Sequence, residues 1–215
     1  MNRTHLTLAL LSIFLMQSQA QSQSTDTPKF EVAAEFTTLE QEAFPNSKTE
    51  PGFGARFTYN LNRMISIETA GYFFPKKCFD CSNNGNVAEV LGGVKVGKRF
   101  EHWGVFGKAR PGVVSFSRGQ FTVRPNPSNP FFPFQFFPER LTNFAADIGG
   151  VVEFYPSKHI VTRFDAGDTI IHSGRRPIEV ITFDQATSAF GLAPFTLPAR
   201  TTHNFQFMTS VGFRF

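Results

Sequence analysis

The chain has 215 residues and a formal net charge of +4 at pH 7, with 28 Phe but only one Trp and three Tyr. This length suits one ordinary domain or one small β-barrel, and so weak a positive charge is no signature of nucleic-acid binding. The mean hydropathy of -0.15 argues against a protein of membrane-spanning helices, although a barrel that hides alternate residues in its lumen can be this neutral.

The first twenty residues have the features of a secretory signal peptide. Arg3 provides a positive charge, residues 6–16 form an apolar run, and Ser18 and Ala20 are small residues at the positions that a signal peptidase requires. The run is too short for a transmembrane helix, which needs roughly 20 apolar residues. We therefore predict cleavage after Ala20, a mobile polar leader over 21–28 and a mature domain over 29–215.

Residues 29–215 contain eight segments in which apolar and polar residues alternate. Side chains alternate between the two sides of a strand, so each segment has one apolar face and one small or polar face. The intervening connections are alternately long and short, as in membrane barrels with long external loops and short periplasmic turns. The pattern predicts an all-β, eight-stranded, antiparallel, up-and-down transmembrane β-barrel with both termini in the periplasm. The predicted strands are 29–39, 51–61, 64–74, 87–98, 103–115, 142–155, 160–171 and 201–215.

The last strand and two glycine-rich hairpins resemble known proteins. Val211, Phe213 and Phe215 alternate up to a terminal aromatic residue, which resembles the closing strand of bacterial outer-membrane barrels. The hairpin sequences GVKVGKRFEHWGVFGKARPG and DIGGVVEFYPSKHIVTRFDAGD look like those of the small outer-membrane β-barrel family, the OmpA-like and OmpX-like barrels. This resemblance implies that the barrel-assembly machinery reads the three terminal residues. It also implies an outer-membrane location among lipid and lipopolysaccharide, and a structural or surface-contact role.

The polar faces of the predicted strands carry a nearly balanced set of charges. An eight-stranded barrel is just wide enough to be filled by its own side chains, and buried charges persist when they are paired. We therefore expect a charge network in the lumen rather than a wide pore, with a small gated channel and a soluble barrel with solvated charges as alternatives. The expected network consists of Glu31, Glu35, Arg56, Glu68, Glu89, Lys95, Lys108, Arg110, Asp147, Glu153, Arg163 and Asp165.

Aromatic residues at the strand ends predict two interfacial girdles, since such residues collect at both surfaces of a bilayer. We assign Phe30, Tyr59, Trp103, Phe154, Tyr155 and Phe215 to the periplasmic girdle, and Phe73, Phe74 and Phe116 to the opposite one.

The long connections contain the remaining candidate sites. Cys78 and Cys81 predict a short-loop disulfide in an oxidising compartment, because zinc would need two more ligands nearby. In the connection 116–141, five prolines between residues 125 and 138 argue against a continuous strand. Its Phe-rich part, 131–137, is expected to pack on the barrel or lipid, or to bind a partner. Arg175 and Arg176 are candidates for contact with lipid phosphates.

A catalytic site is not expected. Asp168, His172 and Ser173 are the nearest approach to an acid, base and nucleophile grouping, but adjacent strand residues point to opposite faces, so His172 cannot directly activate Ser173. No cofactor or metal is predicted. We expect a structural or adhesive protein whose long loops contact an extracellular ligand. A channel, and less plausibly an enzyme acting on outer-leaflet lipid, are the alternatives.

Overall fold

The computed structural model describes residues 27–41, 48–75, 85–128, 133–185 and 189–215. The predicted signal peptide and both cysteines lie outside these residues. Ten strands are present among the described residues, and eight of them close into an antiparallel barrel in the order β1-β10-β7-β6-β5-β4-β3-β2. The predicted eight-stranded barrel is therefore confirmed. The barrel strands are β1 (Phe30–Gln41), β2 (Lys48–Asn60), β3 (Ile65–Phe74), β4 (Val87–Arg99), β5 (Trp103–Pro125), β6 (Phe134–Phe154), β7 (Ile160–Ser173) and β10 (Arg200–Arg214).

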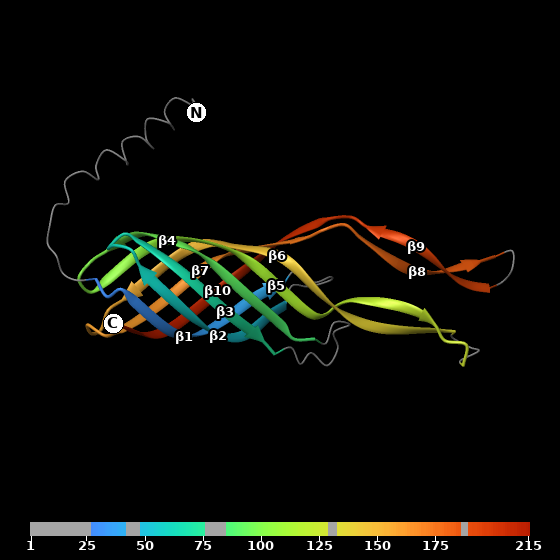
Figure 1. Cartoon of the computed structure of the whole chain (residues 1–215), viewed down its shortest axis with the longest axis horizontal. Helices are drawn as coiled ribbons and strands as arrows, with labels where there is room; N and C mark the ends of the chain where they lie inside the picture. Colours follow the sequence, from blue (N-terminus) through green and yellow to red (C-terminus); the bar gives the residue numbers. More distant parts are fainter. Residues whose placement is uncertain (1–26, 42–47, 76–84, 129–132, 186–188) are drawn as a thin grey trace, which may run out of the picture.

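The first and last strands close the barrel. β1 pairs with β10 from Glu31 opposite Arg214 to Leu39 opposite Gln206. Beyond this ladder, the N–H of Phe30 donates to the carbonyl of Phe215 at 3.0 Å, and the N–H of Phe215 donates to the carbonyl of Phe30 at 2.9 Å. The described chain ends thus meet at one end of the barrel (Figure 1). Closure leaves no unpaired strand edge around the barrel wall.

Alternation along each strand sorts side chains between the lumen and the outside. β3 shows the pattern clearly: Ser66, Glu68, Ala70, Tyr72 and Phe74 are buried, whereas the residues between them are exposed or half-buried. Glycines allow close approach on the inner side. A Cβ atom added to Gly93 would lie 2.0 Å from the carbonyl oxygen of Ala109.

Two predicted loops are in fact β-ribbons, so their assignment as irregular connections was wrong. β5 and β6 continue past the barrel and pair as far as Pro125 opposite Phe134, with a register shift between Phe116 and Gln120. Prolines are tolerated there because a two-stranded ribbon has an outer edge on each strand, where a missing N–H costs no ladder hydrogen bond. The connection from β7 to β10 likewise forms β8 (Arg176–Asp184) paired with β9 (Ala189–Leu197).

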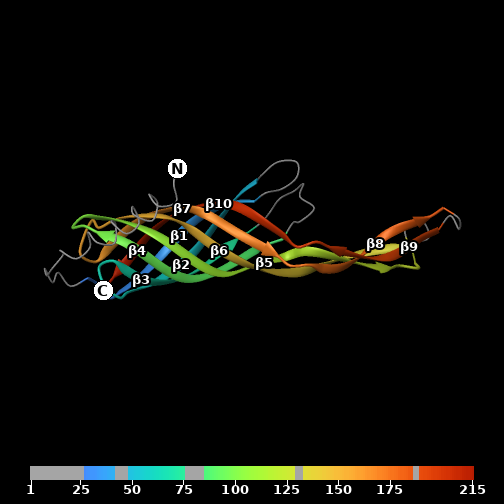
Figure 2. The same ribbon diagram turned by 90° about the horizontal axis from the view of Figure 1, so that it is seen from above.

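Both ribbons extend from the same end of the barrel. Figure 2 shows the β5–β6 and β8–β9 ribbons running along the long axis of the molecule, away from the end that holds the C-terminus. The molecule is therefore a barrel with a long projection. Across the described ranges, no helix is long and apolar enough to cross a membrane.

Candidate functional site

The interior of the barrel is the first candidate site. The structure buries every member of the predicted charge network, each with no more than 4% of its surface exposed. Neighbours that the sequence reasoning did not include lie among them, and these contribute polar or aromatic groups: Tyr72, Arg99, Asn143, Tyr155, Thr169, Asn204 and Gln206. Most of them could have been indicated by their inward positions in the alternation of their strands, but uncharged residues there were not considered. Arg99 was missed because the predicted strand ended at residue 98, whereas β4 runs to Arg99.

Glu68 on β3 lies at the centre of the first of two charge clusters in the lumen. Its carboxylate accepts from Arg163 at 2.5 Å and from Arg56 at 3.3 Å, and the ammonium of Lys95 lies 3.3 Å away. Lys95 also pairs with Glu153. Because these side chains are inaccessible to solvent, each cation offsets the desolvation cost of the carboxylates around it.

A second cluster is centred on Arg110. Its guanidinium donates to Asp147 at 2.5 Å and to the hydroxyl of Tyr72 at 3.2 Å. Tyr72 in turn donates to Glu35 at 2.5 Å, and Lys108 lies 2.8 Å from Asp147. The two clusters are linked, since Arg56 of the first donates to Glu35 at 2.8 Å.

Several of these contacts cross the lumen. β3 and β7 are not neighbours in the barrel, yet Glu68 on β3 binds Arg163 on β7. Gln206 on β10 similarly donates to Glu89 on β4 at 3.0 Å. Apolar side chains fill the section nearer the ribbons, where a buried cluster includes Leu39, Phe74, Leu91, Val114 and Met208. Side chains therefore pack across the barrel interior over the described residues, as expected for eight strands.

The predicted aromatic girdles need three corrections. Phe116, assigned to the girdle at the ribbon end, is half-buried and packs against the buried apolar cluster. Phe74 and Tyr155 are buried at 0% and 5% exposure and point into the barrel, because their neighbours Phe73 and Phe154 point outward. Exposed aromatics of the predicted periplasmic girdle do cluster near the barrel end that holds the C-terminus, whereas Phe73 lies 5.8 Å from Phe53 between ring centroids at the other end. Phe30 lies 5.3 Å from Tyr59 and 5.8 Å from Phe215 between ring centroids, and Phe100 stacks on Trp103 at 4.4 Å.

The outer wall between the strand ends is apolar. Exposed side chains at the outward positions include Phe36, Phe53, Phe57, Ile67, Val90, Val94, Val113, Phe144, Ile148, Phe164, Phe207 and Val211. A surface of this composition is far larger than the apolar patches that soluble proteins leave in water. The distribution of polarity is thus inverted relative to a soluble protein, with charges inside and hydrocarbon outside.

The expected acid, base and nucleophile grouping is not assembled. Asp168 pairs with His203 rather than with His172, at 2.6 Å between carboxylate oxygen and Nδ1. The Nδ1 atom of His172 instead lies 3.0 Å from the hydroxyl of Thr201. His203 has no predicted role, and its position became visible only through the β7–β10 register. Over the described part of the chain, no group of three His, Cys, Asp or Glu side chains could hold a metal ion.

The ribbons form the second candidate site. On the β5–β6 ribbon, one face carries Phe121, Val123, Pro125, Phe134, Phe136 and Pro138, while the other face is mainly polar. Phe134 and Val123 are buried, but Phe136 is 50% exposed. On the polar face, hydrogen bonds from Thr122 and Gln120 hold the pKa of Glu139 below its ordinary value.

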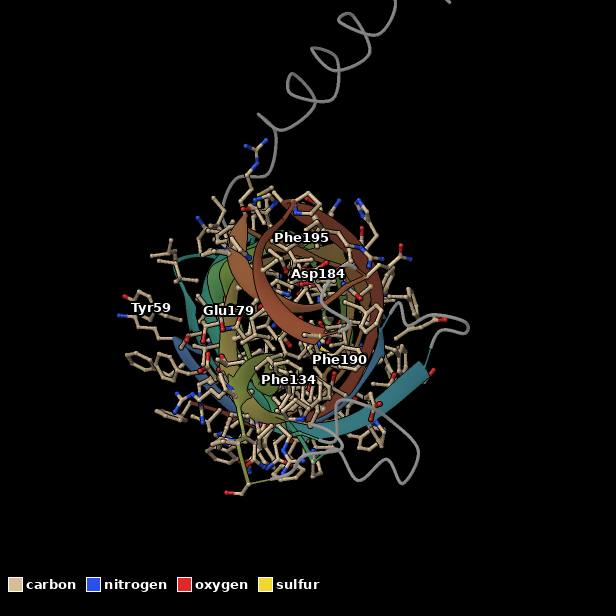
Figure 3. All side chains as sticks on the ribbon, turned by 90° about the vertical axis from the view of Figure 1, so that its right-hand side faces the viewer. Tyr59, Phe134, Glu179, Asp184, Phe190 and Phe195 are labelled. Carbon is tan, nitrogen blue, oxygen red and sulfur yellow. The ribbon has the colours of Figure 1, made fainter. Side chains whose placement is uncertain are left out.

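The β8–β9 ribbon is apolar on both faces. Phe183 and Phe190 pack against each other at 5.1 Å between centroids, yet each exposes more than half of its surface. Phe195 on the opposite face is 49% exposed. Figure 3 views the ribbons from their outer end, with Glu179 and Asp184 of β8 and Phe190 and Phe195 of β9 in front of the barrel opening.

Comparison with known proteins identifies the fold. No family model and no curated protein sequence matches the chain. Among solved structures, Neisserial surface protein A is similar with a TM-score of 0.50 and 12% identity, over 87% of this chain and 97% of that one.

Two further solved structures are similar to the chain. OprG from Pseudomonas aeruginosa has a TM-score of 0.49 and 10% identity over 88% of this chain and 96% of its own. Ail from Yersinia pestis has a TM-score of 0.47 and 13% identity over 87% and 99%. Together with the closed barrel of strands described above, the likeness to Neisserial surface protein A shows that this chain has the fold of the small eight-stranded outer-membrane β-barrels.

Proposed function

We propose that this protein is an outer-membrane β-barrel with a filled interior, which holds two β-ribbons above the membrane for contact with other surfaces. The observation that carries the proposal is the inverted polarity of the barrel. A wall of exposed Phe, Val and Ile side chains encloses a core of paired charges. Only closed barrels and helices satisfy all their backbone groups within a lipid bilayer.

The orientation in the membrane follows from the connections. The short turns and the described chain ends lie at one end of the barrel, and the ribbons lie at the other. In outer-membrane barrels the short turns face the periplasm and the long connections face outward. The ribbons would therefore pass through the lipopolysaccharide layer, where Arg175, at the base of the β8–β9 ribbon, is placed to meet lipid phosphates.

A contact role is favoured over conduction by the lumen packing. The contacts of Glu68 with Arg163 and of Gln206 with Glu89 cross the barrel, and an open pore would have to separate these buried hydrogen-bonded partners. A contact role is also favoured over catalysis, because Asp168, His172 and Ser173 do not form a hydrogen-bonded relay. Fold alone does not decide between these roles, so the proposal rests on the residues.

Heat-modifiability in detergent gels tests the membrane barrel. Unboiled protein from the outer-membrane fraction should migrate faster than boiled protein, because a closed barrel resists detergent until it is heated. The absence of any shift, with the protein in the soluble periplasmic fraction, would refute the membrane location. Planar-bilayer recording of the purified protein then tests the filled lumen. We expect no steady conductance, and a constant open current would favour the channel alternative instead.

A further inference from the structure

The β8–β9 ribbon is an incomplete sheet. Among the described strands, β8 pairs only with β9, and the two form a separate sheet. An isolated two-stranded hairpin is at best marginally stable in water, and three or more strands are usually needed. The exposed rings of Phe183 and Phe190 add an apolar surface that lies outside any bilayer around the barrel. Both features indicate that the ribbon is completed by another strand.

Two prolines identify the edge that can accept this strand. In an antiparallel ribbon, every second cross-strand pair directs its backbone N–H and C=O groups to the outer edges. Pro177 lies opposite Thr196, and Pro194 lies opposite Glu179, two residues further along β8. The two prolines therefore belong to the same set of alternate pairs. Proline has no N–H to give to a ladder, so this set is the one whose backbone groups point away from the partner strand. On β8 the outward-pointing positions are then Pro177, Glu179, Ile181 and Phe183. On β9 they are Phe190, Leu192, Pro194 and Thr196.

The two edges therefore differ. The edge of β8 presents three successive outward donors, at Glu179, Ile181 and Phe183. The edge of β9 is interrupted by Pro194 in its middle, which is a common way to block strand addition. The open edge of the ribbon is thus the β8 edge, and an added strand would bind there through its backbone.

The charges along β8 match a second copy of the same strand. Arg176 and Asp184 lie on one face, four residues on either side of Val180. In an antiparallel pairing of two β8 strands centred on Val180, each Arg176 lies opposite the Asp184 of the other copy, and Pro177 lies opposite Phe183. The Nε and Nη1 atoms of Arg176 are buried within the chain without a hydrogen-bond partner in the described structure, so pairing with a second copy requires this side chain to turn outward. Centring on Ile181 instead would place Asp184 opposite the apolar Ile178.

We infer that β8 is a self-association edge, at which two copies of this protein join their β8–β9 ribbons into one four-stranded antiparallel sheet. The pairing is isologous, so the same surface serves on both copies. Because β8 runs along the long axis beyond the barrel, antiparallel pairing points the two barrels in opposite directions (Figure 2). The two copies therefore stand in facing membranes, and the contact joins one membrane surface to another. This inference rests on the proposed outer-membrane location and surface role.

Clustering of proteoliposomes tests the inference. Two vesicle populations of phosphatidylethanolamine and phosphatidylglycerol carry the protein and different fluorescent lipids, and two-colour coincidence measures vesicle pairing. Wild-type vesicles should pair. Ile181→Pro removes an outward donor from β8 and should lower pairing about tenfold or more, since addition at an edge depends on its backbone hydrogen bonds. Leu192→Pro is the matched control, because Leu192 lies opposite Ile181 on β9 and should leave pairing unchanged.

A charge exchange tests the register. Arg176→Asp places a carboxylate opposite Asp184 and should reduce pairing, and the double variant that adds Asp184→Arg should restore it. Dispersed wild-type vesicles would overturn the inference, as would equal loss in the two proline variants or no rescue by the exchange. Every variant is first checked for heat-modifiability, which reports barrel insertion separately. Failure of that check in the wild type refutes the membrane proposal, whereas dispersed vesicles with inserted barrels refute only self-association.

Discussion

The charge of Glu68 should be essential to the stability of the barrel. Glu68→Gln keeps the volume of the side chain but removes the negative charge that faces Arg56, Lys95 and Arg163 within 3.3 Å. The amide also turns an acceptor into a donor toward these cations. All four side chains have at most 1% exposure, and breaking a buried ion pair costs about 3–5 kcal/mol. With a urea dependence of about 1–3 kcal/mol per molar, the unfolding midpoint should fall by roughly 1–5 M.

Urea titration of the barrel in lipid vesicles measures this change. The fluorescence of Trp103, the single tryptophan, reports unfolding because its ring lies on the outer wall. Glu139→Gln is the control, since that carboxylate lies on the β5–β6 ribbon and hydrogen-bonds to Gln120 away from the lumen cluster. Its midpoint should match the wild type. An unchanged midpoint for Glu68→Gln would mean that the interior charges are not energetically coupled as their geometry indicates.

Three further outcomes are expected. Gly93→Ala should prevent heat-modifiable barrel formation, because the new Cβ would meet the Ala109 carbonyl at 2.0 Å; Gly150→Ala, with nothing within 4 Å, should fold normally. Phe215→Ala should lower the amount of barrel in the outer membrane of cells, measured by immunoblot, while leaving refolding in detergent intact; equal losses in both would contradict an assembly signal. Ser173→Ala should leave the lipid profile of expressing cells unchanged by mass spectrometry, whereas loss of a deacylated product would reveal an enzyme.

The barrel strands were predictable because the lumen and the lipid impose opposite demands on alternate residues. The predicted strand 64–74 matches Ile65–Phe74 almost to the residue, and the inward parity placed Glu68 in the lumen. Parity also shows why Phe74 was misplaced. An aromatic residue at a strand end suggests a girdle by its chemistry, but its inward position relative to Phe73 decides its environment.

Partners across the lumen could not be predicted in the same way. The alternation along one strand tells whether a residue faces the lumen or the lipid. The pairing of Glu68 with Arg163, in contrast, depends on the stagger of the strands around the whole barrel. On the outer wall, the register between β7 and β10 brings Asp168 beside His203 instead of His172. A sequence pattern describes one strand at a time, so contacts between distant strands need the closed structure.

The β8–β9 ribbon escaped prediction for a reason that bears on its role. A strand with one wet and one dry face shows alternation, but β8 and β9 have apolar residues on both faces, such as Val180 on one and Ile181 on the other. A two-sided apolar ribbon in water gains nothing from that composition unless something covers it. The apolar residues on both faces of the ribbon therefore explain why it shows no alternating pattern, and they also indicate that a partner strand covers it. The proline positions then leave β8 as the edge where it can bind.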